Sequence, residues 1–428
     1  MLRIWSLSLG CPKNRVDSER LLGSLGVPVE PVRTMGRAEL VFINTCAFIE
    51  PAVRESLRAI LDAAQRLRRC RRRPLLAVAG CLVGRYGQQE LARELPEVDL
   101  WLPTSDLARW PVLLATALGL PLPVGNARLL STGPSYAWLK VAEGCNHACA
   151  FCTIPSIRGR LHSMPMPTVV QEARSLLAQG VRELILVAQD LTAWGADLNL
   201  KLGHLLEQLA PLDGLAWLRL LYLYPSGVTE ELLRCIKDCG PPLLPYLDIP
   251  LQHAHGDVLR RMGRPFVGDP RRVLDKVRSV LADAVLRTTF IVGYPGESEA
   301  QFQYLCRFVE ESRFQHVGVF AFQAEEGTVA ASLPQQIPDA VKEERRAILM
   351  ELQAEISADL LAQRVGSRME VLVDASHPEW PGLHCGRVWL QAPEADGMTY
   401  VSGPGVVPGR LVECDIVEQT AYDLTALA

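Results

Sequence analysis

Three apolar segments near the start of the chain each end in a cysteine, and this regular arrangement limits the folds that the region can adopt. The segments are RIWSLSLGC, ELVFINTC and PLLAVAGC, which end at Cys11, Cys46 and Cys81, so successive cysteines are 35 residues apart. A strand, a helix and the return to the next strand take about this many residues. We therefore expect residues 1–118 to form an open parallel α/β domain. Because the carboxyl ends of parallel strands share one edge of a sheet, the three cysteines could converge there.

A second region, residues 131–361, again alternates strands with helices after a link rich in proline and glycine. Six of its segments have the length and composition of strands: YAWLKVAEGC, ELILVAQD, WLRLLYLYP, PYLDIPLQH, LRTTFIVGYPG and HVGVFAFQ. This repetition predicts an incomplete (β/α)6 barrel, in which chemistry is expected at the carboxyl ends of the strands. Polar residues lie at those ends: Glu143, Gln189, Asp190, Gln252 and His253.

The last segment, residues 364–428, has a different pattern. Short β-type runs (MEVLVDA, HCGRVWLQ, TYVSG, RLVECDIVEQ and YDLTAL) alternate with glycine and proline. This pattern is typical of a small β-barrel of the OB-like kind. The whole chain is therefore expected to be an α/β protein of three domains, which suits its length of 428 residues.

The composition argues against several classes of protein. Hydrophobic residues make up 49% of the chain and charged residues 21%, which is ordinary for a globular protein. No apolar run reaches the roughly 20 residues of a membrane span, and a net charge of −4 is unlike that of a typical polyanion binder. We expect a cytoplasmic protein without a membrane partner. In that reducing compartment, its twelve cysteines favour metal binding or catalysis over disulfides.

The most specific motif is EGCNHACAFC, which directly follows the first strand of the expected barrel. It places Cys145, Cys149 and Cys152 in the spacing CxxxCxxC. A 4Fe-4S cluster normally takes four thiolates, so three would leave one iron open, as a catalytic metal centre requires. A zinc knuckle that lacks one ligand is the alternative, but the strand context favours a catalytic cluster.

Cys11, Cys46 and Cys81 are a second candidate for a cluster with one open iron. Their spacing alone is equally compatible with three buried thiols, because a free cysteine is often a core residue. The sequence motifs around the three cysteines favour the cluster, because they resemble those of a known family.

Several motifs resemble those of the radical S-adenosylmethionine (SAM) methylthiotransferases. The motifs are LGCPKNRVDSE, NTCAFI, AGCLVGRYG, EGCNHACAFCTIPSIRGR, LYLYPSGVT, YLDIPLQHAHGDVLRRMGRP, TTFIVGYPGE and EEGTVA. The resemblance covers nearly the whole chain, and the last module is similar to a TRAM domain. LGCPKN, CTIPSIRG, YLDIPLQH and QAPEADG are similar to the RimO branch. Arg15, where the family usually has an aliphatic residue, and Ala47, where glycine is common, depart from the pattern.

The resemblance implies two 4Fe-4S clusters, each held by one group of three cysteines, and SAM bound to the cluster on Cys145, Cys149 and Cys152. Reductive cleavage of SAM would provide a radical that takes hydrogen from a substrate carbon. The second cluster would supply sulfur, and a second SAM the methyl group. Phe151 is expected beside the adenine of SAM, and Gln189 and Asp190 are candidates for further SAM contacts. An electron donor such as flavodoxin or ferredoxin would be a partner.

The RimO branch modifies the β-carbon of an aspartate in the twelfth protein of the small ribosomal subunit, either free or in the subunit. Residues 364–428 contain four arginines and nine acidic residues, a net charge of −5. Such a surface would attract a basic protein and repel tRNA, although acids can also serve solubility alone. Methylthiolation of tRNA adenosine, as in the MiaB branch, is the alternative. A non-catalytic iron–sulfur or RNA-binding module is a third interpretation, which predicts no SAM cleavage.

Overall fold

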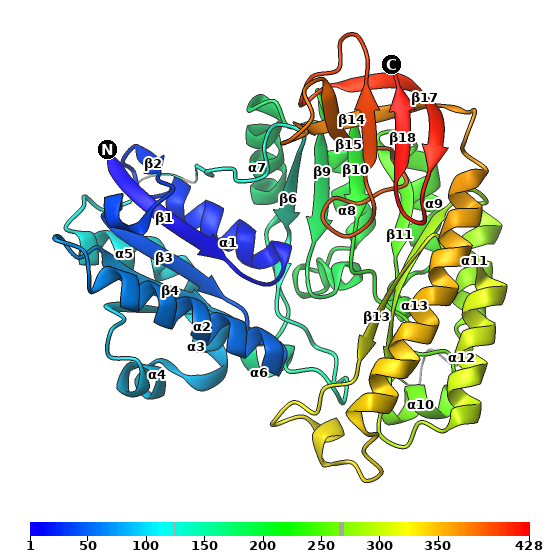
Figure 1. Cartoon of the computed structure of the whole chain (residues 1–428), viewed down its shortest axis with the longest axis horizontal. Helices are drawn as coiled ribbons and strands as arrows, with labels where there is room; N and C mark the ends of the chain where they lie inside the picture. The colour runs from blue at the N-terminus through cyan, green and yellow to red at the C-terminus, as the bar shows by residue number, and fades with distance from the viewer. Residues whose placement is uncertain (124, 126, 265–268) are drawn as a thin grey trace.

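The computed structural model describes residues 1–123, 125, 127–264 and 269–428. Two parallel sheets and a small closed barrel follow one another along the chain (Figure 1). The expected fold class is thus confirmed in all three parts. Within the described residues, no helix is both long enough and apolar enough to cross a membrane.

The first sheet has five parallel strands in the order β2-β1-β3-β4-β5. Its strands are β1 (Leu2–Ser8), β2 (Val29–Pro31), β3 (Leu40–Thr45), β4 (Leu75–Gly80) and β5 (Leu100–Pro103). The helices that accompany them are α1 (Pro12–Gly23), α2 (Glu50–Leu67), α3 (Cys81–Tyr86), α4 (Gln88–Glu94) and α5 (Trp110–Leu118), with 3-10 turns η1 (Met35–Arg37) and η2 (Thr104–Arg109). The strands β3 and β4 are almost fully buried, as expected for parallel strands that helices cover on both faces.

The central sheet has six parallel strands in chain order, β6-β9-β10-β11-β12-β13, and its two edge strands do not pair. The strands are β6 (Tyr136–Lys140), β9 (Glu183–Val187), β10 (Trp217–Leu220), β11 (Leu243–Asp248), β12 (Val285–Val292) and β13 (His316–Ala321). Helices α6 (Ile154–Arg158), α7 (Met166–Ala178), α8 (Leu202–Leu209), α9 (Glu230–Cys239), α10 (Gly256–Arg261), α11 (Arg271–Val280) and α12 (Glu299–Ser312) alternate with them, and β7 (Ala142–Glu143) pairs with β8 (His162–Ser163). Short 3-10 turns are η3 (Leu191–Ala193), η4 (Ala196–Leu198), η5 (Pro225–Gly227) and η7 (Val329–Ser332).

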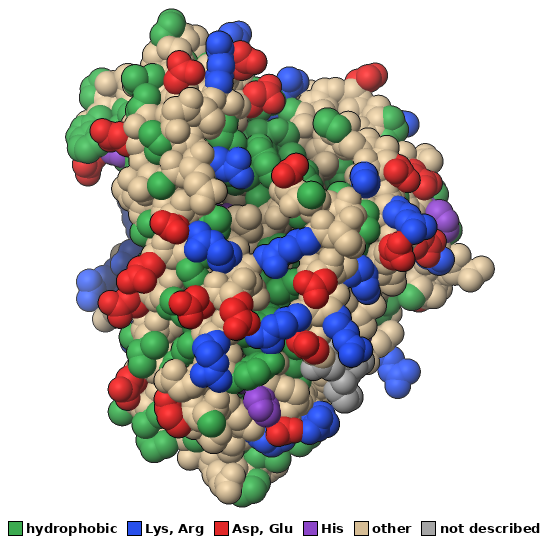
Figure 2. Space-filling model, turned by 90° about the vertical axis from the view of Figure 1, so that its right-hand side faces the viewer, with side chains coloured by type: hydrophobic (Ala, Val, Ile, Leu, Met, Phe, Trp, Pro, Cys, Tyr) green, Lys and Arg blue, Asp and Glu red, His purple; other side chains and the backbone are tan. Residues whose placement is uncertain are grey.

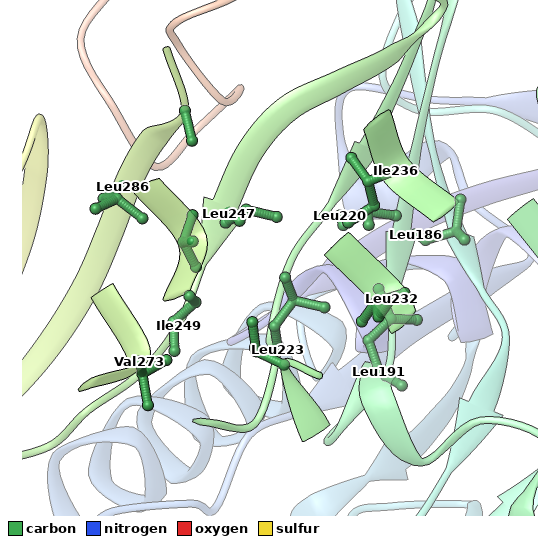
Figure 3. Close-up of a cluster of buried hydrophobic side chains, with 14 of the residues drawn as sticks. Leu186, Leu191, Leu220, Leu223, Leu232, Ile236, Leu247, Ile249, Val273 and Leu286 are labelled. Carbon is green, nitrogen blue, oxygen red and sulfur yellow. The ribbon is translucent and has the colours of Figure 1, made fainter. Parts of the chain in front are cut away.

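The main core lies between these strands and their outer helices. Figure 3 shows Leu186 of β9 and Leu220 of β10 near Leu232 and Ile236 of α9, and Ile249, which follows β11, beside Val273 of α11. Such fully buried aliphatic side chains each stabilise the fold by roughly 1.5–3 kcal/mol. The core therefore fixes the strands, and through them the loops at their carboxyl ends.

The long helix α13 (Asp339–Ala362) leads into the closed barrel of residues 368–427. The five strands of the barrel are β14 (Arg368–Ser376), β15 (Leu383–Arg387), β16 (Thr399–Ser402), β17 (Leu411–Gln419) and β18 (Leu424–Leu427). They coincide with the five short β-type runs of the sequence. The run HCGRVWLQ is shorter than expected as a strand, because β15 ends at Arg387 and the chain then turns away from the sheet.

The residues after β15 close the amino-terminal end of the central barrel. Val388 and Leu390 share a buried cluster with Trp138 and Tyr246, which lie on the inner faces of β6 and β11. The red barrel accordingly lies above the green strands in Figure 1. The central barrel is thus filled at this end by a separate part of the chain.

Buried charges reinforce this contact. Glu183, at the start of β9, receives hydrogen bonds from both Arg219 and Arg387, and all three side chains are almost inaccessible to solvent. Asp396 accepts hydrogen bonds from the Tyr246 hydroxyl (2.6 Å) and from Arg287 (3.0 Å). The motif QAPEADG therefore has a structural role at the base of the barrel.

Four of the nine acids counted in residues 364–428 form ion pairs within the chain, and one of them, Glu413 with Arg368, is at the exposed surface. Asp396 is buried against Arg287, Asp374 pairs with Arg387, and Glu394 pairs with Arg15 of α1. The acidic excess on the outer surface is consequently smaller than the sequence count indicates. On the side of the molecule that carries α11, α12 and α13, acidic and basic side chains are mixed (Figure 2).

We predict that Glu183→Ala lowers the free energy of unfolding by about 3–5 kcal/mol, because it leaves the buried guanidinium of Arg219 without a carboxylate and that of Arg387 with Asp374 alone. Urea denaturation of the purified protein measures this change. Glu413→Ala, which removes the exposed pair of Glu413 with Arg368, is the matched control and should cost less than about 1 kcal/mol. Equal losses in the two variants would contradict a special role for Glu183.

Candidate active site at the junction of the two parallel sheets

The structure brings Cys11, Cys46 and Cys81 together at the carboxyl edge of the first sheet. Cys11 precedes the first turn of α1, Cys46 follows β3, and Cys81 is the first residue of α3. Pro12 opens α1 directly after Cys11, since proline is well suited to the first position of a helix. The backbone of Gly10 approaches Cys46 so closely that an added Cβ would lie 2.7 Å from its Sγ.

Asn14 joins the ends of the three strands. Its side-chain nitrogen donates to the carbonyl oxygens of Leu9 (2.8 Å) and Thr45 (2.9 Å), and its side-chain oxygen lies 3.8 Å from the Sγ of Cys81. Asn14 is fully buried. One amide therefore fixes the backbone beside all three thiols.

The pKa values of Cys46 and Cys81 reflect burial and the neighbouring groups. Burial, together with the neighbouring Cys81 and Cys11, raises the pKa of Cys46 to about 12. Burial also raises the pKa of Cys81, although the Arg158 guanidinium opposes this effect. At neutral pH these thiols hold their protons until a cation replaces them, as metal ligands must lose theirs.

Cys145, Cys149 and Cys152 lie together on the loop between β7 and α6, and each is partly exposed. The Cys145 amide donates to the carbonyl of Gly159 (3.1 Å), and the Cys152 amide donates to that of Cys149 (3.1 Å). Burial, together with the neighbouring Cys149 and Cys145, raises the pKa of Cys152 to about 12. The loop is thus held in a shape that places three mutually interacting thiols side by side.

A hydrogen bond and a ring stack made by His147 position this loop against the barrel. The Nε2 of His147 lies 2.7 Å from a carboxylate oxygen of Asp190, and the imidazole stacks on the ring of Tyr224 at 3.5 Å between centroids. The other carboxylate oxygen of Asp190 accepts from the amide and the hydroxyl of Thr192. Both oxygens of Asp190 are therefore already engaged by protein groups, which indicates a positioning role for this residue.

Gln189 and Phe151 lie in different surroundings. The side-chain amide of Gln189 donates to Glu143 (2.8 Å), and its buried Oε1 has no partner among the described residues. Gln252, in the loop after β11, likewise has a buried Oε1 without such a partner. Phe151 packs against a separate apolar cluster that includes Met262 and Tyr294. The unpaired acceptors after β9 and β11 indicate a place for a polar ligand, since buried polar atoms are normally hydrogen-bonded.

Buried ions join the first sheet to the central barrel beside the two cysteine groups. Asp17 of α1 forms ion pairs with Lys140 of β6 and with Arg158 of α6. Glu143 accepts from Lys140 (2.7 Å) and Arg158 (3.0 Å), and although burial alone would raise the pKa of Glu143, these cations lower it to about 2. Two cations and two carboxylates therefore neutralise one another at the interface.

Arg158 also contacts the first cysteine group directly. It donates to the side-chain oxygen of Asn14 and lies 3.4 Å from the Sγ of Cys81. Nearby, the hydroxyl of Thr153 donates to the carbonyl of Phe48 (3.1 Å), which joins the residue after Cys152 to the loop after Cys46. The two cysteine groups consequently face each other across a single interface.

A second polar contact joins the first domain to the loop that follows β13. Glu325 follows β13, and its carboxylate accepts from the amide of Glu50 (2.7 Å) and from Arg85 (2.9 Å). The side chain of Glu325 is buried. The first domain is therefore held at two separate places on the mouth of the barrel.

Lys13 reaches from α1 into the mouth of the barrel. Its Nζ lies 3.6 Å from the centroid of the Tyr222 ring and 3.4 Å from the carbonyl oxygen of Ala188. Burial lowers the pKa of Lys13, but Tyr222 and Cys11 outweigh this effect and raise it. Lys13 is therefore a cation between the two cysteine groups.

The donor sets suit iron–sulfur clusters better than a single metal ion. Within the described residues, no three His, Cys, Asp or Glu side chains are arranged to hold one ion. A cluster spans more space than an ion and takes thiolates, which fits two groups of three thiols. Gly10 and Gly144, both with positive φ, lie just before the first cysteine of each group, and a Cβ on Gly144 would collide with the carbonyl of Arg160.

A cavity of about 700 Å³ lies beside this junction, between α1, α5 and α7. Asp17, Lys140 and Glu143 form one of its ends, and Arg20 and Glu172 also line it. None of the six cysteines contributes to its lining. We therefore do not assign this cavity to the candidate active site.

The sequence drew attention to the cysteines but not to the residues that hold them. Asn14 and Lys13 belong to the motif LGCPKN, and Arg158 belongs to CTIPSIRG, so the motifs already included these three residues. Their roles depend on contacts between residues far apart in the sequence, such as Arg158 with Asn14, which are 144 positions apart. Spacing along the chain cannot reveal such contacts.

We predict that Arg158→Met increases hydrogen exchange at the amides of the first turns of α1, because Asp17 loses one of its two cations in a buried site. Mass spectrometry of exchanged peptides measures this effect. Arg160→Met changes an exposed arginine two residues away and is the control. Unchanged exchange in Arg158→Met would contradict the assigned role of the ion pair.

Comparison with known protein families supports the same three parts of the chain. Residues 139–309 match the Radical SAM superfamily, residues 3–103 match the Uncharacterized protein family UPF0004, and residues 365–428 match the TRAM domain. Two solved structures of the radical SAM methyltransferase TsrM from Kitasatospora setae are similar in fold. Their TM-scores are 0.54 and 0.55 at 14% and 13% sequence identity, and the matches cover 90% of this chain and 77% and 78% of those chains.

Curated relatives match the chain over its whole length. The protein named ribosomal protein uS12 methylthiotransferase RimO from Nitratidesulfovibrio vulgaris (strain Hildenborough) is 63% identical over 100% of both chains. The proteins of that name from Oleidesulfovibrio alaskensis and Geobacter sulfurreducens are 59% and 42% identical, over 100% of both chains and over 99% of this chain and 97% of the relative. With this identity, these domains and this fold, the chain belongs to the RimO family of radical SAM methylthiotransferases.

Proposed function

We propose that this enzyme methylthiolates the β-carbon of an aspartate in ribosomal protein uS12. The observation that carries the proposal is the placement of two three-cysteine groups on opposite sides of one buried interface. The chemistry needs two different metal centres that act on one substrate carbon. The contacts of Arg158 with Cys81 and of Thr153 with the loop after Cys46 support that arrangement.

We assign SAM and its 4Fe-4S cluster to Cys145, Cys149 and Cys152, and a second 4Fe-4S cluster to Cys11, Cys46 and Cys81. When bound, these groups supply a radical that can take hydrogen from an unactivated carbon, together with the sulfur and methyl of the product. The unpaired acceptors on Gln189 and Gln252 suit the ammonium or hydroxyl groups of SAM. The contact between His147 and Asp190 would hold the cysteine loop in place beside bound SAM.

The ion pairs at the interface have two further consequences. They hold the two cluster sites in a fixed relation, so substrate positioning does not depend on movement between the domains. They also exclude water from the space beside Cys81, because Asp17, Arg158 and Lys140 are almost fully buried. A radical intermediate needs such protection from side reactions.

We further propose that the enzyme works in the cytoplasm, where its ribosomal substrate is found, and that flavodoxin or ferredoxin supplies its electrons. The substrate is uS12, either free or in the small subunit. The domains are proposed to span residues 1–118, 131–361 and 364–428. In support of these boundaries, α5 ends at Leu118 and α13 ends at Ala362.

The alternative substrate, adenosine in tRNA, is less compatible with the outer surface of residues 364–428. The exposed acids Glu370, Glu379, Asp415 and Glu418 have no ion-pair partner among the described residues. They would repel a phosphate backbone and attract a basic protein. The excess is smaller than the sequence count, so the names of the relatives carry more weight than the charge.

We predict different defects when each cysteine group is changed. Cys149→Ala should abolish cleavage of SAM by the reduced enzyme, whereas Cys46→Ala should retain cleavage and lose insertion of sulfur. Chromatography of SAM products and mass spectrometry of uS12 measure the two steps. Cys414→Ala, in the last barrel, is the control and should retain both. Full methylthiolation by Cys149→Ala or Cys46→Ala would disprove the two-cluster assignment.

The substrate is tested in cells with and without the gene. Mass spectrometry of uS12 should show a methylthio group on one aspartate that disappears with the gene. Nucleosides from total tRNA should be unchanged. Loss of a methylthio-adenosine with intact uS12 modification would retain the chemistry but transfer the enzyme to the tRNA substrate.

A further inference from the structure

Two buried cations in the described part of the chain lack a carboxylate within 4.0 Å, and both lie near the cysteines. They are Lys13 and Arg264. The other buried lysines and arginines of this part each form an ion pair: Arg128, Lys140, Arg158, Arg219, Lys342, Arg345 and Arg387. An unpaired buried charge is costly, so its retention indicates an anion that binds there.

The two unpaired cations differ in position. Arg264 donates to the carbonyl of Pro250, lies over the ring of Tyr224, and is next to Gly263, which packs against the loop of Cys149. It therefore belongs to the side of the site that holds SAM. Lys13 lies two residues after Cys11, on the other side of the site.

The ammonium of Lys13 has unused hydrogen-bonding capacity. Among the described residues its one hydrogen bond is the long contact of 3.4 Å to the carbonyl of Ala188, whereas an ammonium has three donors. Ala188 lies two residues before Asp190, and Tyr222 lies two residues before Tyr224. The Lys13 Nζ is consequently at the ends of β9 and β10, near the contact between His147 and Asp190 that positions the second cysteine group.

Tyr222, which lies under Lys13, has an unusual backbone conformation. Its φ is +62°, in the left-handed region that a bulky residue rarely adopts. The conformation is held by hydrogen bonds from its amide to Asp248 (2.9 Å) and from the Leu191 amide to its carbonyl (3.0 Å). Backbone strain of this kind is typical of binding sites, and here it places the aromatic ring that supports the ammonium.

The inner face of the barrel is open on the side opposite Lys13. Along β12, Arg287, Thr289 and Ile291 are partly exposed, whereas the intervening residues are buried against the outer helices. On the neighbouring β13, Val317 and Val319 face the core, so Phe320 lies on the inner face, where it is 57% exposed. A peptide segment can therefore enter the barrel from this side.

We propose that Lys13 binds the carboxylate of the substrate aspartate and so holds its β-carbon between the two cysteine groups. This inference rests on the proposed function, which supplies an anionic substrate side chain. Arg287 is less suited to this role, because Asp396 and Asp248 already neutralise it. The competing role for Lys13 is that of a counter-charge for a cluster on Cys11, which would affect the cluster but not the choice of substrate.

The test measures the dissociation constant of purified uS12 with the reconstituted enzyme and SAM in the absence of a reductant. Four enzyme–substrate pairs are compared: wild type and Lys13→Met, each with natural uS12 and with uS12 in which the modified aspartate is asparagine. Methionine keeps much of the length and apolar packing of the lysine stem. Lys237→Met, which changes an exposed lysine at the end of α9, is the matched control.

Wild type and Lys237→Met should bind natural uS12 about 10- to 100-fold more tightly than the asparagine protein, as expected for a hydrogen bond between charged groups. Lys13→Met should bind both proteins with the weaker affinity. If wild type binds both proteins equally, the proposal is wrong, whether or not Lys13→Met folds. The proposal is also wrong if Lys13→Met prefers natural uS12 over the asparagine protein as strongly as wild type does. A variant that loses bound iron but keeps this preference contradicts it in the same way.

A failure of the proposed function has a different signature. In that case wild type with reductant leaves natural uS12 without a methylthio group. If only the role of Lys13 is wrong, uS12 is methylthiolated and the discrimination between aspartate and asparagine is independent of residue 13.

Discussion

The ion pairs of Asp17 with Lys140 and Arg158 connect the two halves of the candidate active site. Asp17 belongs to the helix that begins after Cys11, whereas Lys140 and Arg158 flank the loop of Cys145, Cys149 and Cys152. Because all three side chains are buried, the removal of any one leaves an uncompensated charge. These ion pairs therefore stabilise the observed arrangement of the first sheet and the central barrel, which places the two cysteine groups opposite each other. The proposed two-cluster chemistry depends on this arrangement, since both centres would act on the same carbon.

The other end of the barrel is closed by a different part of the chain. The segment after β15 inserts apolar side chains and Asp396 beneath the inner faces of the strands, where Glu183 also pairs with Arg219 and Arg387. The last domain thus helps to enclose the central barrel. Between the two closed ends, the inner face of β12 and β13 stays open to solvent. The exposed side chains of β12 and β13 in the described part of the chain are compatible with the approach of a peptide segment carried by a larger protein.

Much of this architecture could be predicted from the sequence, because it depends on local pattern. The 35-residue spacing of Cys11, Cys46 and Cys81 indicated the parallel sheet, and six strand–helix repeats indicated the partial barrel. The contacts that give the site its geometry could not be predicted, because they join distant residues. Asn14 contacts three strand ends, Arg158 contacts Cys81, and Asp396 lies beneath the barrel. For the same reason, the acids of the last domain gave too large an estimate of its outer charge: Asp374 and Asp396 point into the protein and pair with arginines there.

The central claim is that two clusters lie close together in one rigid site. Electron paramagnetic resonance of the reduced, reconstituted enzyme tests it most directly, because two nearby paramagnetic clusters broaden and split each other's signals. The account predicts such spin coupling in the wild type, with roughly eight irons per chain, and an uncoupled spectrum of a single cluster in Cys46→Ala. A wild-type spectrum without coupling, identical to that of Cys46→Ala, would contradict the claim.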